Sequence, residues 1–557
     1  MPLRAPPSRL RRPTLPAFLL AAALATGPAW AQGDVGAYLA AREAGQARDV
    51  AGALPYLERL FDAHPDDLAL PQRIVLALGS LGQVGGAADL GGPLSEGDPV
   101  NPVAGLTLIA DGFARRDFGA VLARIGVGGQ GNPLLDTLAE AWAQLGLGRV
   151  TEALAALDRA AGEPGAELFA AYCRALILAM VGDAEGALDI LQAPMGLHEM
   201  LNRRGTMAYV QLLGQVDRFD DALAEIDTSF PGATDPQLAR MRAAYEAGQS
   251  LPFDMIAGPA EGMAEVYALM AGVILSPQNA QDALLYAQAA LAISPDLSDA
   301  RLVTGQIFEE LGLLDLADAA YGAIGADDAL ALPAALGRAQ TLAAQDRLDE
   351  AIESLQATVA AHPANLIAPQ VLGDFLRRAG RHPEAIAAYS LAIDALRAAG
   401  REPGWPLLFA RAVSHERSGQ WPQAEADFRA ALAVEPDQPT VLNYLGYSLV
   451  ERNEMLDEAL DMIERAVAGE PGSGYIVDSL AWALFRLGRY DEALPVMERA
   501  VALPPSDPIL NDHLGDLYWA VGRQREARFQ WRRALSFGPH DDLDMDRVRR
   551  KIEVGLD

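Results

Sequence analysis

A sequence repeat with a period of 34 residues restricts the folds that this chain can adopt. It is clearest between residues 440 and 539, where alanines and prolines recur at one constant step. The recurring residues are Ala459, Ala493 and Ala527, then Ala466, Ala500 and Ala534, and finally Pro471, Pro505 and Pro539. Small residues within each unit and a proline at its end are typical of stacked helix–turn–helix repeats. We therefore expect helix pairs, each packing on its neighbours along the chain.

The first of these alanine positions can be followed back almost to the N-terminus, and we call the whole series the alanine ladder. Its earlier members are Ala53, Ala87, Ala120, Ala153, Ala187, Ala222, Ala283, Ala317, Ala351, Ala385 and Ala424. Glycines stand five residues before several of them: Gly148, Gly182, Gly312, Gly380 and Gly419. Because only a small side chain lets paired helices approach closely, we expect the ladder to be buried.

Two steps of the ladder break the period. The step after Ala385 is 39 residues long and includes a Gly/Pro-bearing stretch at 398–404, which predicts a longer loop. The step after Ala222 is 61 residues long. It begins with a helical pattern from residue 236, but Pro252 and Pro259 then rule out one continuous helix.

These breaks predict the organisation of the chain. We expect a helical array at 32–235, an irregular junction at 236–262, a second array at 263–540 and a capping helix at 541–557. The apolar face of that capping helix would be Leu543, Val548 and Ile552. A cap is expected because the last unit of a repeat array otherwise exposes an apolar face.

Residues 1–31 have the three parts of a secretory signal peptide. An arginine-bearing start precedes an apolar core at 15–25, and Ala29, Trp30 and Ala31 precede Gln32. A membrane anchor is the weaker interpretation because the apolar run is too short to span a bilayer. We expect cleavage near Ala31 and a mature protein in the periplasm of a Gram-negative-type cell, with the export route left open.

The net charge of the chain limits the classes of partner that it is expected to bind. The chain has 44 basic and 75 acidic residues and a formal net charge of −31. Nucleic acid and anionic membrane surfaces would repel such a protein, so neither is expected as a partner. No direct membrane span is expected either. The single cysteine, Cys173, cannot form an internal disulfide, and its apolar surroundings predict a buried thiol.

Patterns that support catalysis are not found in the sequence. Residues 126–131 (GVGGQG) have the spacing of a dinucleotide-binding loop, but no strand–helix context surrounds them, so a loop between repeat helices is the better interpretation. The seven histidines are scattered without a metal-binding spacing. We therefore predict no enzyme activity, no catalytic residue, no metal and no cofactor.

The stacked first helices of the last units should present a concave surface. The inward-facing candidates are Asn443, Tyr447, Tyr475, Asp478, Trp482, Phe485, Arg486, Asp512, Asp516 and Trp519. Aromatic and arginine side chains are frequent anchors for protein partners, and Trp482, Arg486 and Trp519 are spaced so that one peptide could contact all three. The alternative is that Trp482, Phe485 and Trp519 belong to the core between helices, and the sequence leaves both interpretations open.

The segments LNYLGYSLVERNEMLDEALDMIERA and DSLAWALFRLGRYDEAL resemble the tetratricopeptide repeat (TPR) family. The resemblance implies an all-α, right-handed α-solenoid of about 14 TPR-like helix–turn–helix units, and a protein-binding scaffold or adaptor. Members that bind a chaperone's terminal carboxylate use Lys and Asn at set positions. This chain has Asp478, Ser479, Trp482 and Arg486 there, or Asp512, His513, Asp516 and Ala520 in the next unit, so that ligand is not implied.

Together with LPFDMIAGPAEGMAEVYALM, the same stretches look like exported TPR proteins of proteobacteria. One member type is a lipoprotein adaptor that presents substrates to a periplasmic carboxyl-terminal processing protease. This chain departs from it because no cysteine stands at the cleavage point, so any outer-membrane association would be peripheral and through partners. The alternatives are an assembly factor for an envelope polysaccharide or outer-membrane protein complex, and, more remotely, an enzyme acting on a carbohydrate. Partner identity and oligomeric state stay open.

Overall fold

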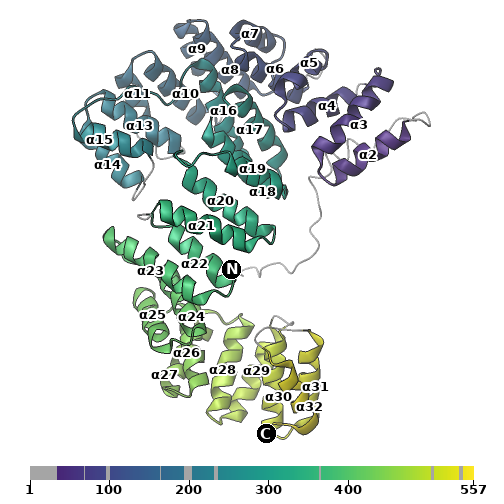
Figure 1. The fold of residues 1–557 in the computed structure, drawn as a ribbon, viewed down its shortest axis with the longest axis vertical. Helices are drawn as coiled ribbons and strands as arrows, with labels where there is room; N and C mark the ends of the chain where they lie inside the picture. The colour runs from purple at the N-terminus through teal and green to yellow at the C-terminus, as the bar shows by residue number, and fades with distance from the viewer. Residues whose placement is uncertain are drawn as a thin grey trace. The chain divides into compact units, whose positions relative to one another are not determined.

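The computed structural model describes residues 34–67, 69–95, 101–163, 165–192, 203–230, 236–362, 365–503, 507–538 and 543–556. Over these ranges the chain forms thirty helices and no strand (Figure 1). None of the described helices is long and apolar enough to cross a bilayer. The signal-peptide prediction at 1–31 and the repeat prolines Pro505 and Pro539 lie outside the described residues.

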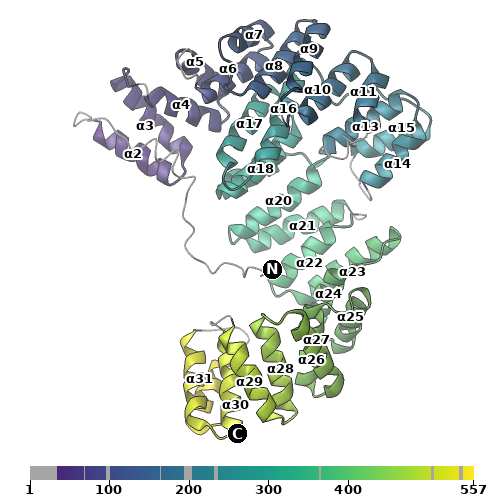
Figure 2. The ribbon, with the colours of Figure 1, turned by 180° about the vertical axis from the view of Figure 1, so that it is seen from behind.

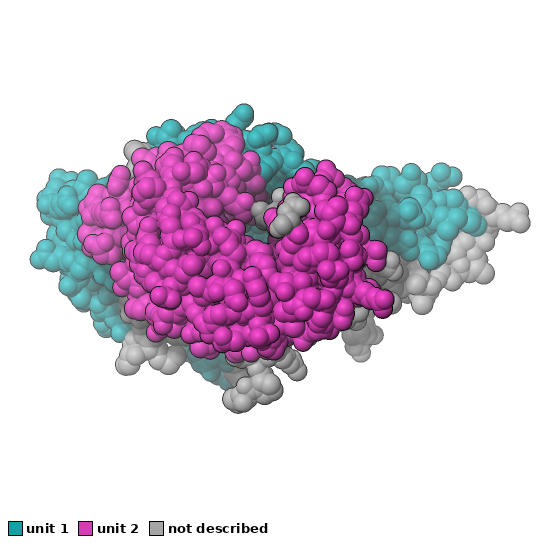
Figure 3. All heavy atoms as spheres, turned by 90° about the horizontal axis from the view of Figure 1, so that it is seen from below, with its two compact units in different colours: residues 1–365 teal, residues 366–557 magenta. Residues whose placement is uncertain are grey.

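The chain divides into two compact units, unit 1 (Met1–Asn365) and unit 2 (Leu366–Asp557), which Figure 3 shows in different colours. The helices of unit 1 are α2 (Val35–Gln46), α3 (Val50–Ala63), α4 (Ala69–Ser80), α5 (Val84–Ser95), α6 (Pro102–Ala114), α7 (Phe118–Gly126), α8 (Pro133–Gly146), α9 (Val150–Ala160), α10 (Glu167–Met180), α11 (Ala184–Leu191), α13 (Arg203–Gln215), α14 (Phe219–Ser229), α15 (Pro236–Glu246), α16 (Pro259–Ile274), α17 (Ala280–Ile293), α18 (Ser298–Leu311), α19 (Leu314–Gly322), α20 (Ala331–Ala344) and α21 (Leu348–Ala361).

Unit 2 continues the pattern of helix pairs to the C-terminus. Its helices are α22 (Ala368–Arg378), α23 (His382–Ala398), α24 (Trp405–Arg417), α25 (Trp421–Val434), α26 (Pro439–Arg452), α27 (Leu456–Gly469), α28 (Gly474–Arg486), α29 (Tyr490–Ala502), α30 (Pro508–Ala520), α31 (Gln524–Ser536) and α32 (Met545–Val554). Apart from α15 and α32, the described helices form fourteen consecutive pairs, so the predicted all-α solenoid is confirmed.

The alanine ladder is buried between the paired helices. Its members from Ala153 to Ala527 are fully buried, as are Ala466, Ala500 and Ala534. The glycines between paired helices have the positive φ that ends a helix in the left-handed conformation, for example 75° at Gly488. Close approach also needs glycine on the first helix of the last pair, because a Cβ at Gly515 would lie 2.4 Å from the Trp531 ring.

One member of the ladder is misplaced. Ala120 is exposed, and Val121 is the buried residue of α7. The reason is the helix start: the Asp117 side chain accepts from the backbone N–H of Ala120, so the fourth position after this N-cap is Val121. The same fourth position holds Ala53 after the N-cap Asp49.

The junction has the predicted local structure but does not divide the chain. Helix α15 occupies its start, residues 247–258 are not helical, and α16 begins at Pro259. One hydrophobic core nevertheless continues from Val84 to Ala300. The boundary between compact units therefore falls after Asn365, because the helices that follow the junction pack back onto the first array.

Candidate functional site

Helices α16 and α17 occupy the inner side of unit 1. Helix α16 packs against α8 and α10, and α17 packs against α4 and α6. Figures 1 and 2 show both helices inside the arc formed by the earlier pairs. Residues 262–268 of α16 are all buried, which a helix achieves only when it is enclosed on every side. The concave surface of the first array is thus filled by the chain itself.

A buried polar network fixes α16 in this position. Glu265 is 2% exposed, accepts a hydrogen bond from the Tyr172 hydroxyl at 3.1 Å and pairs with Arg204. Burial raises the pKa of Glu265 above its usual value, although Arg204 opposes the effect. Arg204 also donates to the carbonyl of Met255 and lies 3.5 Å from Asp299, so one guanidinium joins α13, the non-helical junction, α16 and α18.

Unit 2 contains an open cleft of about 670 Å³, which we call the C-terminal cleft. Its wall is formed by α26, α28 and α30, together with the end of α24, the start of α25 and the start of α32. Six of the ten predicted site residues line it: Asn443, Tyr447, Tyr475, Asp478, Trp482 and Asp512. The other four, Phe485, Arg486, Asp516 and Trp519, are not part of the lining.

The repeat explains how these side chains come together. Equivalent positions on α26, α28 and α30 lie one unit apart, so they form a row across the stacked helices. We call Asn443, Asp478 and Asp512 the acceptor row. All three are at most 6% exposed and line the C-terminal cleft.

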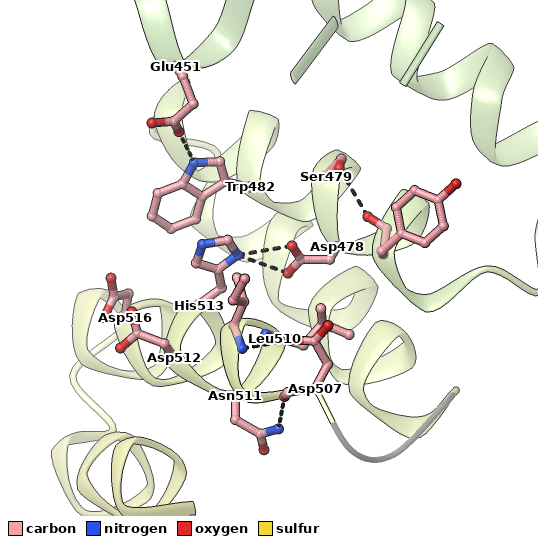
Figure 4. A network of polar contacts seen from close by, with 12 residues as sticks. Glu451, Asp478, Ser479, Trp482, Asp507, Leu510, Asn511, Asp512, His513 and Asp516 are labelled. Atoms are coloured by element: carbon pink, nitrogen blue, oxygen red, sulfur yellow. Dashed lines mark hydrogen bonds and ion pairs between the residues drawn. The ribbon is translucent and has the colours of Figure 1, made fainter. Parts of the chain in front are cut away.

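Trp482 is a structural part of the cleft wall rather than an exposed anchor. It is 7% exposed, and its ring stacks on His513 at a centroid distance of 4.1 Å and on Phe485 at 4.9 Å. Its indole N–H donates to Glu451, which also pairs with Arg486 at 3.2 Å (Figure 4).

His513 joins the acceptor row to the aromatic stack. Its Nδ1 lies 3.0 and 3.1 Å from the two carboxylate oxygens of Asp478 (Figure 4). Burial lowers the pKa of His513, but Asp478, Asp512 and Asp516 outweigh burial and hold that pKa above its usual value. The sequence analysis named His513 only as a mismatch with the carboxylate-binding pattern.

Lys551, the one lysine of the chain, is buried in unit 2. Its Nζ lies 2.7 Å from Asp512 and 2.7 Å from Asp516, and the lysine is 4% exposed. Asp516 also accepts from the indole N–H of Trp531 at 2.9 Å. Burial, helped by Asp512, raises the pKa of Asp516 against the opposing effect of Lys551.

The predicted capping helix explains why one peptide could not contact Trp482, Arg486 and Trp519 together. Val548 of α32 is fully buried, and a Cβ at Gly555 would lie 2.0 Å from the Trp519 ring. Trp519 also packs on Trp531, with ring centroids 5.6 Å apart. The C-terminal segment therefore packs over Trp519, which is partly buried against the core of the last unit.

The exposed aromatic of the C-terminal cleft is Tyr475, whose side chain is 49% exposed. Chemically, the lining combines aromatic rings with an excess of hydrogen-bond acceptors.

Among the residues that the structure describes, no group of histidine, cysteine and carboxylate side chains could hold a metal ion. Gly126 ends α7, and residues 127–131 lie in the loop between α7 and α8, where the sequence predicted a loop. Cys173 is buried, and burial raises the pKa of its thiol to about 12.

Comparison with known proteins agrees with the helical repeat. The tetratricopeptide repeat family matches residues 336–400, 409–474 and 479–542. A TPR repeat-containing protein of Pseudomonas aeruginosa is 36% identical over 83 residues, which are 15% of this chain and 14% of that protein. The matched part is thus a small fraction of that relative's length.

Three solved structures align with this chain at low sequence identity. A tetratricopeptide repeat protein from Parabacteroides merdae has 15% identity and a TM-score of 0.39, and the match covers 47% of this chain and 99% of the other. A thermophilic TPR protein from Thermus thermophilus has 22% identity and a TM-score of 0.29, with 34% and 98% covered. The Cut9–Hcn1 hetero-tetramer of APC/C has 15% identity and a TM-score of 0.36, with 98% and 99% covered.

Proposed function

Since the chain is a tetratricopeptide-repeat protein, we propose that it is a non-enzymatic scaffold that binds a segment of a partner protein in the C-terminal cleft. One observation carries the proposal: the cleft presents an exposed aromatic, Tyr475, above a row of buried polar side chains. Exposed aromatics beside buried polar groups are the usual anchors of protein recognition. The interior of unit 1 supports the same location, because α16 and α17 occupy the inner side of its first array (Figure 1).

The role that we propose is that of an adaptor in the periplasm, presenting bound substrates to an envelope protease. The support is the resemblance of the repeat segments and of LPFDMIAGPAEGMAEVYALM to exported adaptors of this type. Co-purification tests the role directly, because an adaptor should recover a protease. Recovery of a membrane-bound assembly complex in its place would contradict the adaptor role and favour the assembly factor.

Export is the first expected result. The signal-like segment at 1–31 ends in Ala29, Trp30 and Ala31, the small-residue pattern that signal peptidases cleave. N-terminal sequencing of the protein isolated from its native cell should therefore begin at or near Gln32. A cytoplasmic product that still starts at Met1 would remove both the periplasmic location and the proposed protease partner.

Replacing Tyr475 by alanine should impair partner binding and leave the fold intact. The ring is 49% exposed and lines the cleft, so its loss should weaken binding by about 2 kcal/mol, roughly thirtyfold. Crosslinking in the native compartment, followed by mass spectrometry, would identify the partner, and its recovery by each variant would then be compared.

Tyr490→Ala is the matched control. Tyr490 is 39% exposed on α29 and is not part of the cleft lining, so the control removes a similar ring from another surface. Thermal melting of both variants should resemble that of the wild type. Equal partner recovery by Tyr475→Ala and Tyr490→Ala would show that the C-terminal cleft is not the binding surface.

A further inference from the structure

We propose that the C-terminal cleft selects a partner segment that carries an arginine side chain, held between Asp478 and Asn443. The inference rests on the proposed function and adds the chemistry of the bound segment. Three features of unit 2 lead to it: an internal cation on the acceptor row, the unequal pairing along that row, and the charge of the cleft lining.

The chain itself shows what the end of the acceptor row binds. Lys551 reaches from α32 to α30 and places its ammonium group on Asp512, at 2.7 and 2.9 Å from the two carboxylate oxygens. The lysine is 4% exposed, so this is a fully formed site for a cationic side chain. One repeat earlier, the equivalent position on α28 is also an aspartate, Asp478.

The members of the acceptor row are less completely hydrogen-bonded from α30 towards α26. Asp512 has a lysine partner, whereas the hydrogen-bond partner of Asp478 is the His513 ring, at 3.0 Å. At Asn443, 6% exposed and in the cleft lining, the side-chain oxygen accepts no hydrogen bond from any residue that the structure describes. A buried acceptor left without a donor is costly, so the Asn443 end of the row is suited to a ligand that brings donors.

The charge of the cleft lining favours a cation. Six carboxylates line it, Glu416, Glu451, Asp478, Asp507, Asp512 and Asp544. The basic groups of the lining are three guanidinium groups, those of Arg417, Arg452 and Arg547, and the His513 ring, which pairs with Asp478. Behind the lining, Glu451 pairs with Arg486 and Asp512 with Lys551, while Arg452 pairs with Glu454 and Arg547 with Asp516.

Two of the carboxylates are held by neutral donors and not by cations. Asp507 and Asp544 accept hydrogen bonds from backbone amides at the starts of α30 and α32. Two of the lining arginines are already engaged: Arg452 lies 4.7 Å from the Trp421 ring centroid and pairs with Glu454, and Arg547 lies near Asp516. The lining therefore offers acceptors and negative charge, which attract an incoming cation.

Arginine fits this lining better than other side chains. Its guanidinium has five N–H donors and no acceptor, which matches a carboxylate beside an unpaired amide oxygen. It is flat and stacks on aromatic faces, and the exposed ring of Tyr475 stands one helical turn before Asp478 on α28. A glutamate at the same place would be repelled by the excess of carboxylates in the lining.

Binding of labelled peptides to the whole chain tests the inference. Three short fluorescein-labelled peptides would be compared by fluorescence anisotropy at about 0.15 M salt. In the first, arginine alternates with serine; in the other two, citrulline or glutamate takes the place of arginine. Citrulline keeps the shape of arginine without its charge. We expect the arginine peptide to bind about tenfold or more tightly than the citrulline peptide, and the glutamate peptide not to bind.

Two cleft variants and a matched control locate the site. Asp478→Asn keeps an oxygen for the His513 ring but removes the negative charge. It should lower the affinity for the arginine peptide by about tenfold or more. Glu416→Gln changes a partly exposed residue of the lining and should weaken binding less. Glu492→Gln makes the same change in charge on the exposed face of α29, and it should leave binding unchanged.

Each result supports or contradicts the choice of arginine. Equal binding of the arginine and citrulline peptides, or of Asp478→Asn and Glu492→Gln, would overturn the choice of arginine. If Asp478→Asn melts early, Glu416→Gln decides in its place. The proposed function is judged separately, by partner recovery with Tyr475→Ala, so a scaffold whose cleft binds an uncharged segment would fail here and still pass that test.

Discussion

Replacing Lys551 by methionine should lower the free energy of unfolding of unit 2 by about 3–5 kcal/mol. The lysine is buried between Asp512 and Asp516, whose side chains are 7% and 2% exposed. Without the ammonium group the two buried carboxylates would keep only the exposed Arg547, 3.9 Å from Asp516, as an ion-pair partner among the described residues, although methionine would fill much of the same volume. Urea unfolding followed by tryptophan fluorescence would measure the change, since Trp531 lies beside the ion pair.

Arg549→Met is the control, because Arg549 carries the same charge on α32 but is 58% exposed and pairs with Asp546 at the surface. We expect it to change stability by no more than about 1 kcal/mol. Lowering the pH should reduce the difference in the free energy of unfolding between Lys551→Met and the wild type. Burial already raises the pKa of Asp516, and protonation removes the repulsion that the variant creates. Equal urea midpoints for Lys551→Met and Arg549→Met would show that the ion pair does not stabilise the cap.

Neighbouring units were predictable because one steric requirement repeats. Paired helices can approach closely only over a small residue, so the ladder alanines Ala459 and Ala493 and the turn glycine Gly488 identify the helix pairs. The error at Ala120 has the same origin. Spacing alone assigned that position, whereas the N-cap Asp117 sets the helix start and gives the buried position to Val121.

Contacts between distant units were not predictable from the period, which reports only how one unit packs on the next. The return of α16 and α17 to α4–α10 depends on side chains far apart in sequence, such as Tyr172 and Glu265. A signal was nevertheless present in α16, whose apolar residues occur on every face of the helix. Such a helix is enclosed rather than amphipathic.

The candidate site was partly predictable for a related reason. Register placed Asn443, Asp478 and Asp512 in one row, and they line one cleft. The capping helix was also predicted, and a helix that packs on the last unit covers Trp519 and supplies a partner for Asp516. The single lysine of the chain, Lys551, was the available signal, because a lone lysine beside buried aspartates is a natural counter-ion.

Replacing Arg204 by methionine should destabilise unit 1 by about 3–5 kcal/mol. Glu265, 2% exposed, would then lose its cationic partner, and the Tyr172 hydroxyl would be the remaining donor that the described residues give it. The guanidinium also holds the carbonyl of Met255, so the non-helical junction should loosen with it. Hydrogen exchange would therefore rise in α16 and in the segment before it, and urea unfolding would occur at a lower concentration.

Charge, and not lost packing, should account for most of that defect, and a second substitution separates the two. Arg204→Met combined with Glu265→Gln removes both charges and keeps the Tyr172 hydrogen bond, so it should recover much of the lost stability. The pH dependence has a definite sign. Burial raises the pKa of Glu265, so the folded state binds a proton more readily than the unfolded state, and the single variant should regain stability as the pH falls through that raised pKa. A double variant no more stable than Arg204→Met, together with a pH-independent defect, would mean that Arg204 stabilises α16 by packing alone.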